Sequence, residues 1–244
     1  MTERGTMDDP RVISYQALRK AIGIIGLLLP FVLVIGTWLL TRNFPAVRSS
    51  ISSYYYSTMG DVLVGSLCAI GVFLFSYKGY DSPASRLPFV RGFVRGRDDL
   101  VSSLAGVCAV GVAIFPTQEE STSAKELVTD IPGLHVLFAA IFFVSLAYIS
   151  SFRFTDHGPV TREPETRDDA KQERRWENLI YRVCGGGIVA CLLLIVGAWA
   201  FQDDYPLIKQ VYPVLVLETL AIWAFSISWF LKGSESLKRA LRKG

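Results

Sequence analysis

Residues 49–77 read SSISSYYYSTMGDVLVGSLCAIGVFLFSY. The first part is rich in hydroxyl and aromatic side chains, and it leads through Asp61 into an apolar run that continues to Tyr77. At about 1.5 Å per residue, a helix of about 20 nonpolar residues crosses a hydrocarbon core of about 30 Å. The stretch therefore predicts a membrane-spanning helix with one carboxylate near its beginning.

The rest of the chain has the same character. Its 244 residues are 51% hydrophobic and 19% charged, with a mean hydropathy of +0.36, which is too apolar for an ordinary soluble domain. No segment shows the alternating polarity of a transmembrane barrel. We predict an all-α, polytopic membrane bundle of six helices in a single integral membrane domain, residues 1–244. The expected spans are 21–40, 59–77, 100–115, 133–152, 179–201 and 212–231, with a helical extension over residues 166–178.

The basic residues predict the orientation of the chain. Of the 25 Lys and Arg residues, 20 fall in the N-terminal segment, the loops after the second and fourth spans, and the C-terminal tail. The other three loops hold 4. Because basic residues concentrate on the cytoplasmic side, both termini are expected there. The second, fourth and sixth spans would then enter the bilayer from its outer face.

Three ionisable residues stand near the beginnings of these three spans: Asp61, His135 and Glu218. An unpaired charge inside a bilayer costs about 2.5–3.5 kcal/mol on insertion scales, so Glu218 is expected to face protein or a wet cavity. We predict one outward-facing polar pocket for a proton, a cation or a polar headgroup. The candidate pocket residues are Asp61, His135, Glu218, Ser53, Tyr54, Tyr55 and Tyr56.

Small residues suggest which helix faces are packed. Asp61, Gly65, Cys68 and Val72 share one face of the second span, and we expect this face to point at other helices. The third span, residues 100–115, is rich in Ala, Gly and Ser and is expected at the centre of the bundle. Such faces would also suit a homo-oligomer.

Other motifs are weaker. The run Gly185–Gly187 indicates either a close helix contact or a flexible point, and it lacks the preceding strand that a nucleotide-binding loop needs. No basic surface interleaved with aromatic residues points to nucleic acid, so membrane lipids are the expected partners. We predict no cofactor and no metal.

Several segments resemble a family of six-span bacterial inner-membrane proteins of unknown function. The residues that carry the resemblance are the Tyr54–Tyr56 approach, Asp61–Phe75, Tyr77–Asp81, Leu104–Gly106 and Phe115–Thr117. The resemblance implies the same architecture and a place in the bacterial inner membrane. It implies no activity.

The chain is more weakly similar to the membrane hydrolases of the alkaline ceramidase and adiponectin-receptor superfamily, which place Ser, Asp and three His around zinc. Ser52 or Ser53, Asp61 and His135 match parts of that set, but only Glu218 stands where a late His pair is expected.

Two main classes of function follow. The first is proton, cation or small-solute transport, or a channel-like activity, in which Glu218 and Asp61 handle the charge. The second is a membrane-embedded lipid hydrolase, metal-dependent or not, or a lipid-binding protein. A structural accessory subunit is the third alternative.

Overall fold

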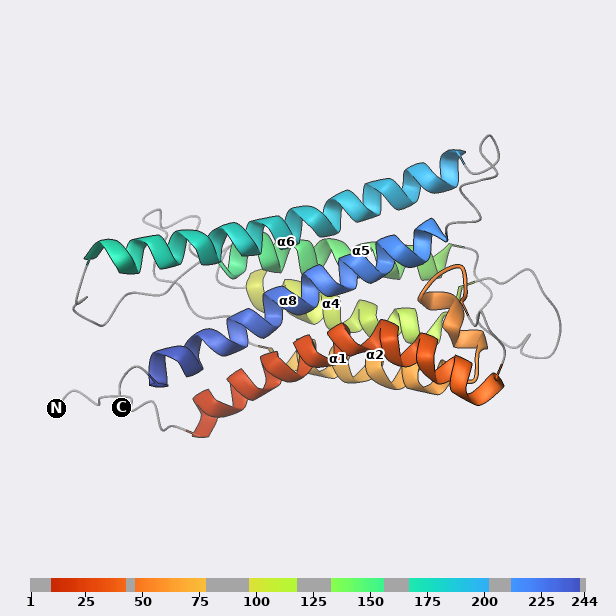
Figure 1. The fold of residues 1–244 in the computed structure, drawn as a ribbon, viewed down its shortest axis with the longest axis horizontal. Helices are drawn as coiled ribbons and strands as arrows, with labels where there is room; N and C mark the ends of the chain where they lie inside the picture. The colour runs from red at the N-terminus through yellow and green to blue at the C-terminus, as the bar shows by residue number, and fades with distance from the viewer. Residues whose placement is uncertain are drawn as a thin grey trace.

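The computed structural model describes residues 10–42, 47–77, 97–117, 133–155, 167–201 and 212–241. Over these residues the chain is helical and contains no strand (Figure 1), which confirms the all-α fold class. The elements are α1 (Pro10–Thr41), the 3-10 turn η1 (Ser52–Tyr56), α2 (Gly60–Ser76), α4 (Arg97–Ile114), α5 (Leu134–Tyr148), the π-helical turn η2 (Ile149–Arg153), α6 (Arg167–Phe201) and α8 (Pro213–Leu241).

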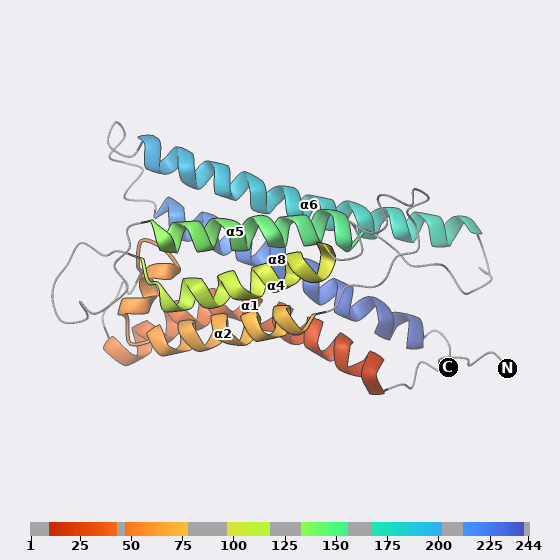
Figure 2. The ribbon, with the colours of Figure 1, turned by 180° about the vertical axis from the view of Figure 1, so that it is seen from behind.

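The six α-helices of the described residues lie side by side along the long axis of the molecule (Figure 2). α1 packs against α2 and α8, α4 packs against α2 and α5, and α6 packs against α5 and α8, so the order of neighbours closes into a ring. The beginning of α1 and the end of α8 lie at one end of the bundle, which we call the terminal end (Figure 1). η1 lies at the opposite end, which we call the cap end.

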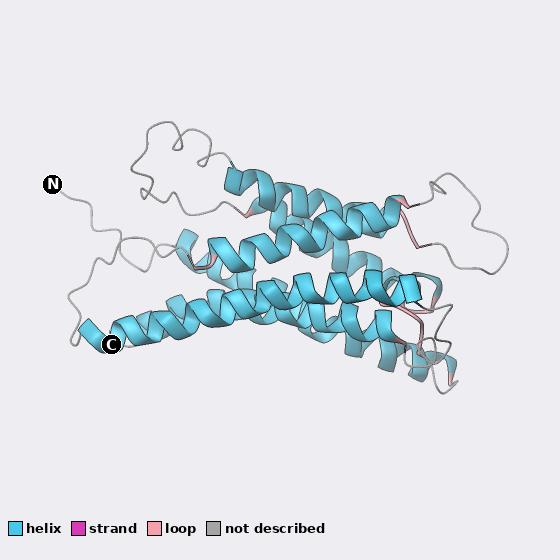
Figure 3. Cartoon of the chain, turned by 90° about the horizontal axis from the view of Figure 1, so that it is seen from above, coloured by secondary structure: helices cyan, strands magenta, loops and turns pink. Residues whose placement is uncertain are grey.

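Among the described residues, four helical segments are long and apolar enough to cross a membrane, and two others are apolar but shorter. Figure 3 shows the helices from above, running roughly along one direction with loops at their ends. The long ones are Gln16–Thr41, Leu134–Arg153, Arg175–Phe201 and Pro213–Ser234, and the shorter ones are Gly60–Ser76 and Leu100–Ile114. Large apolar side chains such as Leu39 and Leu193 also face outward along these helices. An apolar outer surface on apolar helices indicates a membrane-embedded protein.

α4 is not the central helix that its small residues led us to expect. It buries Ser102, Ala105 and Ala109, whereas Leu100 is 66% and Val107 53% exposed. The helix is one member of the ring, with a packed face and an outward face.

The small residues of α4 instead allow a close approach to α2. A Cβ atom added to Gly71 would lie 2.8 Å from the carbonyl oxygen of Gly106, and one added to Gly106 would lie 2.6 Å from the carbonyl oxygen of Gly71. Backbones this close leave no room for a side chain, which is how small residues stabilise helix pairs in lipid.

The three consecutive glycines of α6 have different surroundings. A Cβ at Gly185 would overlap the Ser151 hydroxyl and lie 2.8 Å from the Ala147 carbonyl oxygen, so Gly185 makes the close helix contact. Gly186 and Gly187 have open space where a side chain would be.

Two hydrophobic clusters fill the interior. The larger one includes Leu74, Leu146, Phe154, Tyr181 and Trp229. The smaller one lies at the cap end and consists of Leu29, Leu33, Ile51, Tyr54, Met59 and Leu63. This second cluster fixes η1 against α1 and α2 and so positions the residues discussed next.

Candidate functional site

The cap end is formed by residues 47–59, which we call the cap segment. Its backbone is organised by two serines: the Ser50 N–H donates to Ser53 Oγ at 3.2 Å, and the Ser53 N–H donates to Ser50 Oγ at 3.0 Å. The Ser53 hydroxyl also donates to the Ser50 carbonyl oxygen at 2.8 Å. Short hydroxyl side chains favour such local bonds over a continuous helix, which explains the tight turn. The Ser53 hydroxyl, predicted to line a pocket, is buried within the cap segment.

Glu218 ties the cap segment to α8. Its carboxylate Oε2 accepts a hydrogen bond from the Ile51 N–H at 2.6 Å, and the Ser52 N–H also bonds to this side chain. One turn earlier on α8, the Leu215 N–H donates to the Ser49 carbonyl oxygen at 3.1 Å. A partly buried carboxylate that accepts two backbone N–H groups has the partners that its desolvation requires.

The three tyrosines of the cap segment lie in three different environments. Tyr54 is fully buried, and burial raises the pKa of its phenol above the ordinary value of 10.0, an effect that Arg48 partly offsets. Tyr56 is 40% exposed, and its hydroxyl donates to the Thr117 carbonyl oxygen at 2.8 Å, which joins the cap segment to the end of α4. Tyr55 packs edge-on against Tyr56 and faces a cleft.

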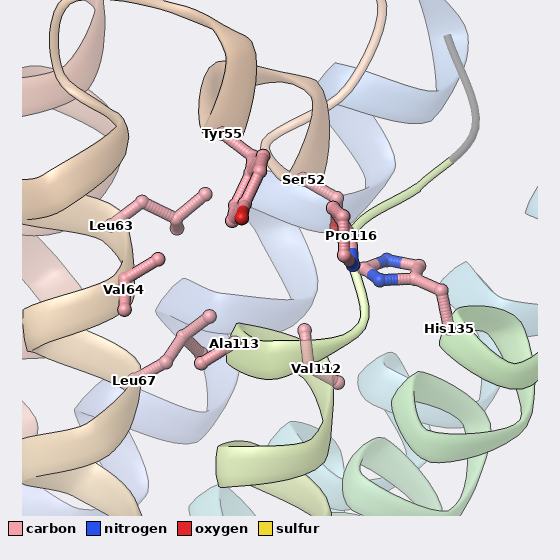
Figure 4. Close-up of a pocket in the computed structure, with 9 residues that line it drawn as sticks. All are labelled: Ser52, Tyr55, Leu63, Val64, Leu67, Val112, Ala113, Pro116 and His135. Carbon is pink, nitrogen blue, oxygen red and sulfur yellow. The ribbon is translucent and has the colours of Figure 1, made fainter. Parts of the chain in front are cut away.

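This cleft lies between the cap segment, α2, α4 and the beginning of α5 (Figure 4). Its empty space is about 200 Å³, including the part that opens to solvent. The part of it that the centre of a water-sized sphere can occupy is only about 10 Å³, about what one water molecule needs, so the cleft suits water or a small ion. Its lining residues are Ser52, Tyr55, Leu63, Val64, Leu67, Val112, Ala113, Pro116 and His135.

His135 is oriented by the end of α4. Its Nδ1 lies 2.7 Å from the Phe115 carbonyl oxygen. A carbonyl oxygen only accepts, so Nδ1 carries the proton, and in the neutral ring Nε2 holds the free electron pair. The Phe115 carbonyl is available because α4 ends at Ile114 and Pro116 cannot continue the helix.

Asp61 lies apart from the cleft. It stands in the first turn of α2 with its side chain exposed, and a Cβ at Gly65, one turn further on, would meet nothing within 4 Å. Val72 on the same face is 59% exposed. The prediction that this face points at other helices is wrong, because α2 packs through the face that carries Leu63, Ile70 and Leu74, with Gly71 at its edge.

The cap end thus brings together some of the predicted residues and separates others. Tyr55 and His135 line one cleft, and Ser52 joins this cleft to Glu218, since its backbone N–H bonds the carboxylate while the residue lines the cleft. Sequence analysis named Ser52 only as an alternative to Ser53 in the resemblance to membrane hydrolases, and it left Ser52 out of the candidate pocket residues. Its position in the serine-rich turn before the tyrosine run is the signal that could have added it to them.

The residues that the structure describes contain no group of three His, Cys, Asp or Glu side chains placed to hold a metal ion. Comparison with protein-family models, with curated proteins and with solved structures finds no match to this chain. The geometry of the cap end therefore carries the functional argument alone.

Proposed function

We propose that the chain is a six-span protein of the bacterial inner membrane with both termini in the cytoplasm. Two observations support this topology: the 20-to-4 distribution of basic residues, and the position of the beginning of α1 and the end of α8 at one end of the bundle. The cap end then faces outward. Reporter fusions after Lys243 and within residues 162–171 should read cytoplasmic, and a fusion within residues 117–130 should read periplasmic. A periplasmic reading after Lys243 would reverse the assignment.

Within this topology, we propose that the cap end handles protons or small cations in a transport or channel-like activity. The observation that carries the proposal is the Glu218 carboxylate, which lies inside an apolar helix and bonds a segment that also lines the cleft of His135. Ionisable groups inside membrane helices are costly and mark proton and ion pathways.

The chemistry of the cleft favours a proton or a small cation over a larger solute. Nε2 of His135 and the carboxylate of Glu218 are two proton acceptors, with Ser52 between them. Ser52 and Tyr55 contribute hydroxyl groups that both donate and accept hydrogen bonds. The space is too small for a drug-sized molecule.

The test is flux into liposomes that contain the purified protein. With a pH-sensitive dye inside and an imposed membrane potential, the protein should accelerate internal acidification over that of empty liposomes. Glu218→Gln should reduce the rate to that of empty liposomes. Asp61→Asn is the matched control and should keep the wild-type rate, because Asp61 lies outside the cleft. Wild-type rates equal to those of empty liposomes, with proton and with sodium or potassium dyes, would reject the proposal.

One observation favours the hydrolase alternative. Ser52 and His135 line the same cleft, and the proton on Nδ1 leaves Nε2 free to act as a base toward a hydroxyl. A fluorophosphonate probe should then label the wild-type protein and fail to label Ser52→Ala. An unlabelled wild-type protein would remove this alternative.

A further inference from the structure

The apolar segments of the described helices differ in length, and the two shortest belong to neighbouring helices. Those of α2 and α4 contain no more than 17 residues, whereas those of α1 and α6 contain 26 and 27. At about 1.5 Å per residue, the 17 residues of α2 span about 25 Å, which is less than a hydrocarbon core of about 30 Å. Because α2 and α4 pack against each other, the shortfall is concentrated on one side of the bundle.

Charged groups mark both ends of the apolar surface of α2. Asp61 is exposed in the first turn, at the cap end. Toward the terminal end, Arg19 Nη2 of α1 donates to the hydroxyl of Tyr77, the residue that follows α2. The helical rise from Asp61 to Tyr77 is about 24 Å, and the exposed large apolar side chains between them cover a band of about 20 Å. These side chains are Val62, Val72 and Phe75.

The outward face of α4 has an apolar band of the same length. It begins at Leu100, which is 66% exposed and follows Asp99 in the sequence. It ends at Ile114, which is 53% exposed and is the last residue of the helix. Just beyond it, the Thr117 carbonyl oxygen accepts the hydroxyl of Tyr56. The rise from Leu100 to Ile114 is about 21 Å, so both neighbours fit the same reduced thickness.

The apolar surface of α6, which lies across the bundle from α2, is longer (Figure 2). Val183 and Phe201 are both exposed, and the sequence between them contains no charged residue. The rise between these two residues is about 27 Å, close to the thickness of an ordinary hydrocarbon core. Trp176 and Leu179 extend the exposed apolar surface further toward the terminal end. The two sides of the bundle therefore fit bilayers of different thickness.

A short apolar helix has few ways to fit a thicker bilayer. Tilting reduces the distance that a helix spans, so it does not help. Snorkelling needs a long side chain, whereas the carboxylate of Asp61 is separated from the backbone by a single methylene. A second copy placed symmetrically on this side would bring two Asp61 carboxylates to the same depth, where like charges repel. Local thinning of the bilayer remains, and it leaves Asp61 at the level of the headgroups.

We propose that the outward faces of α2 and α4, which we call the thin side, contact a locally thinned bilayer, so that the protein fits phospholipids with short acyl chains. The proposal rests on the proposed six-span topology, because α2 and α4 must cross the membrane. It does not depend on proton or cation flux through the cap end.

The test measures the melting temperature of the full-length protein by tryptophan fluorescence in phosphatidylcholine vesicles. The acyl chains lengthen from dimyristoleoyl through dipalmitoleoyl and dioleoyl to dierucoyl. The wild type should be most stable in one of the two shorter lipids and melt about 2–4 °C lower in the longest. Asp61→Leu lengthens the apolar band of α2, so its most stabilising lipid should be one step longer. Gly65→Leu is the matched control, because it adds an apolar side chain in open space on the same exposed face without moving either end of the band.

A wild-type optimum in dioleoyl or dierucoyl lipid would overturn the proposal, as would an unchanged optimum in Asp61→Leu. The same shift in Gly65→Leu would assign the effect to added apolar area and not to the length of the band. If Asp61→Leu does not fold, Ser76→Leu takes its place, because Ser76 is exposed at the other end of the band, and the same criterion applies.

Cross-linking tests whether a second copy covers the thin side. Val107→Cys lies on the outward face of α4 and Leu193→Cys on that of α6, at positions that are 53% and 68% exposed. In vesicles at high dilution, both should form equally few disulfide-linked pairs under mild oxidation. Pairs formed preferentially through Val107→Cys would assign the thin side to a second copy and overturn the proposal.

A reporter fusion separates failure of this proposal from failure of the topology. Within residues 78–96 the reporter should read cytoplasmic if α2 crosses the membrane. A periplasmic reading would show that α2 does not cross, and the six-span topology and the thin side would then both be rejected. A cytoplasmic reading together with an unchanged lipid optimum in Asp61→Leu would reject the thin side alone.

Discussion

The Glu218 carboxylate accepts a hydrogen bond from the Ile51 N–H at 2.6 Å across 167 residues of sequence. This contact joins Glu218, which the sequence places about two turns into its predicted span, to the segment that covers the cap end. It gives Glu218 a structural role that is independent of transport. Substitutions at residue 218 should therefore separate the contribution of the hydrogen bond to stability from that of the negative charge.

Glu218→Gln should fold and lose about 1 kcal/mol of stability, because the amide oxygen still accepts from Ile51 but without the charge. Glu218→Leu should lose about 2–5 kcal/mol, because the N–H groups of Ile51 and Ser52 are then left without an acceptor. Unfolding in mixed micelles measures both losses, and Asp61→Asn, which alters an exposed carboxylate, should lie within about 0.5 kcal/mol of wild type. Equal stability of the Gln and Leu variants would show that the hydrogen bond contributes little.

Tyr54 should make stability depend on alkaline pH. Burial raises its pKa in the folded protein above 10.0, so the folded state favours the neutral phenol. The resulting stability is fully present below the unfolded pKa of 10.0 and is lost as the pH rises through the higher folded pKa. Tyr54→Phe should flatten this loss in melting curves between about pH 9 and 11. An identical alkaline decline in both proteins would contradict the assignment to Tyr54.

The contact between α2 and α4 provides a matched pair of substitutions. Gly71→Ala should destabilise the protein by about 1–3 kcal/mol, since its Cβ would lie 2.8 Å from the Gly106 carbonyl oxygen and force the helices apart. Gly65→Ala lies on the same helix with nothing within 4 Å, and it should be neutral or slightly stabilising. Thermal unfolding of the two variants measures the difference. If both behave alike, helix propensity and not close packing determines the effect.

The fold was more predictable than the cap end. Apolar runs locate the six α-helices of the part of the chain that the structure describes, because such runs reflect burial or lipid contact whatever the partner is. The same apolar character does not show which face is packed: Gly65, one turn after Asp61, faces open space, while Gly71, about a quarter of a turn from Asp61 around the helix, makes the close contact. The partner of Glu218 could not be predicted either, because every residue except proline has a backbone N–H and nothing in the sequence marks that of Ile51. Likewise, the one indication of the bond to His135 was that the apolar run ends at Pro116, which leaves the Phe115 carbonyl oxygen without a partner in the helix.

His135→Asn should separate proton transfer from structural support at the cleft. The Asn amide nitrogen occupies nearly the position of Nδ1 and can still donate to the Phe115 carbonyl oxygen, whereas the Nε2 electron pair is lost. If His135 relays protons, this variant should melt within about 2–4 °C of wild type and yet lose flux in the liposome assay. His135→Leu should also lose flux, but with a loss of about 1 kcal/mol in stability, because the bond to Phe115 disappears. Wild-type flux in His135→Asn would show that the role of His135 is limited to its hydrogen bond with Phe115 at the end of α4.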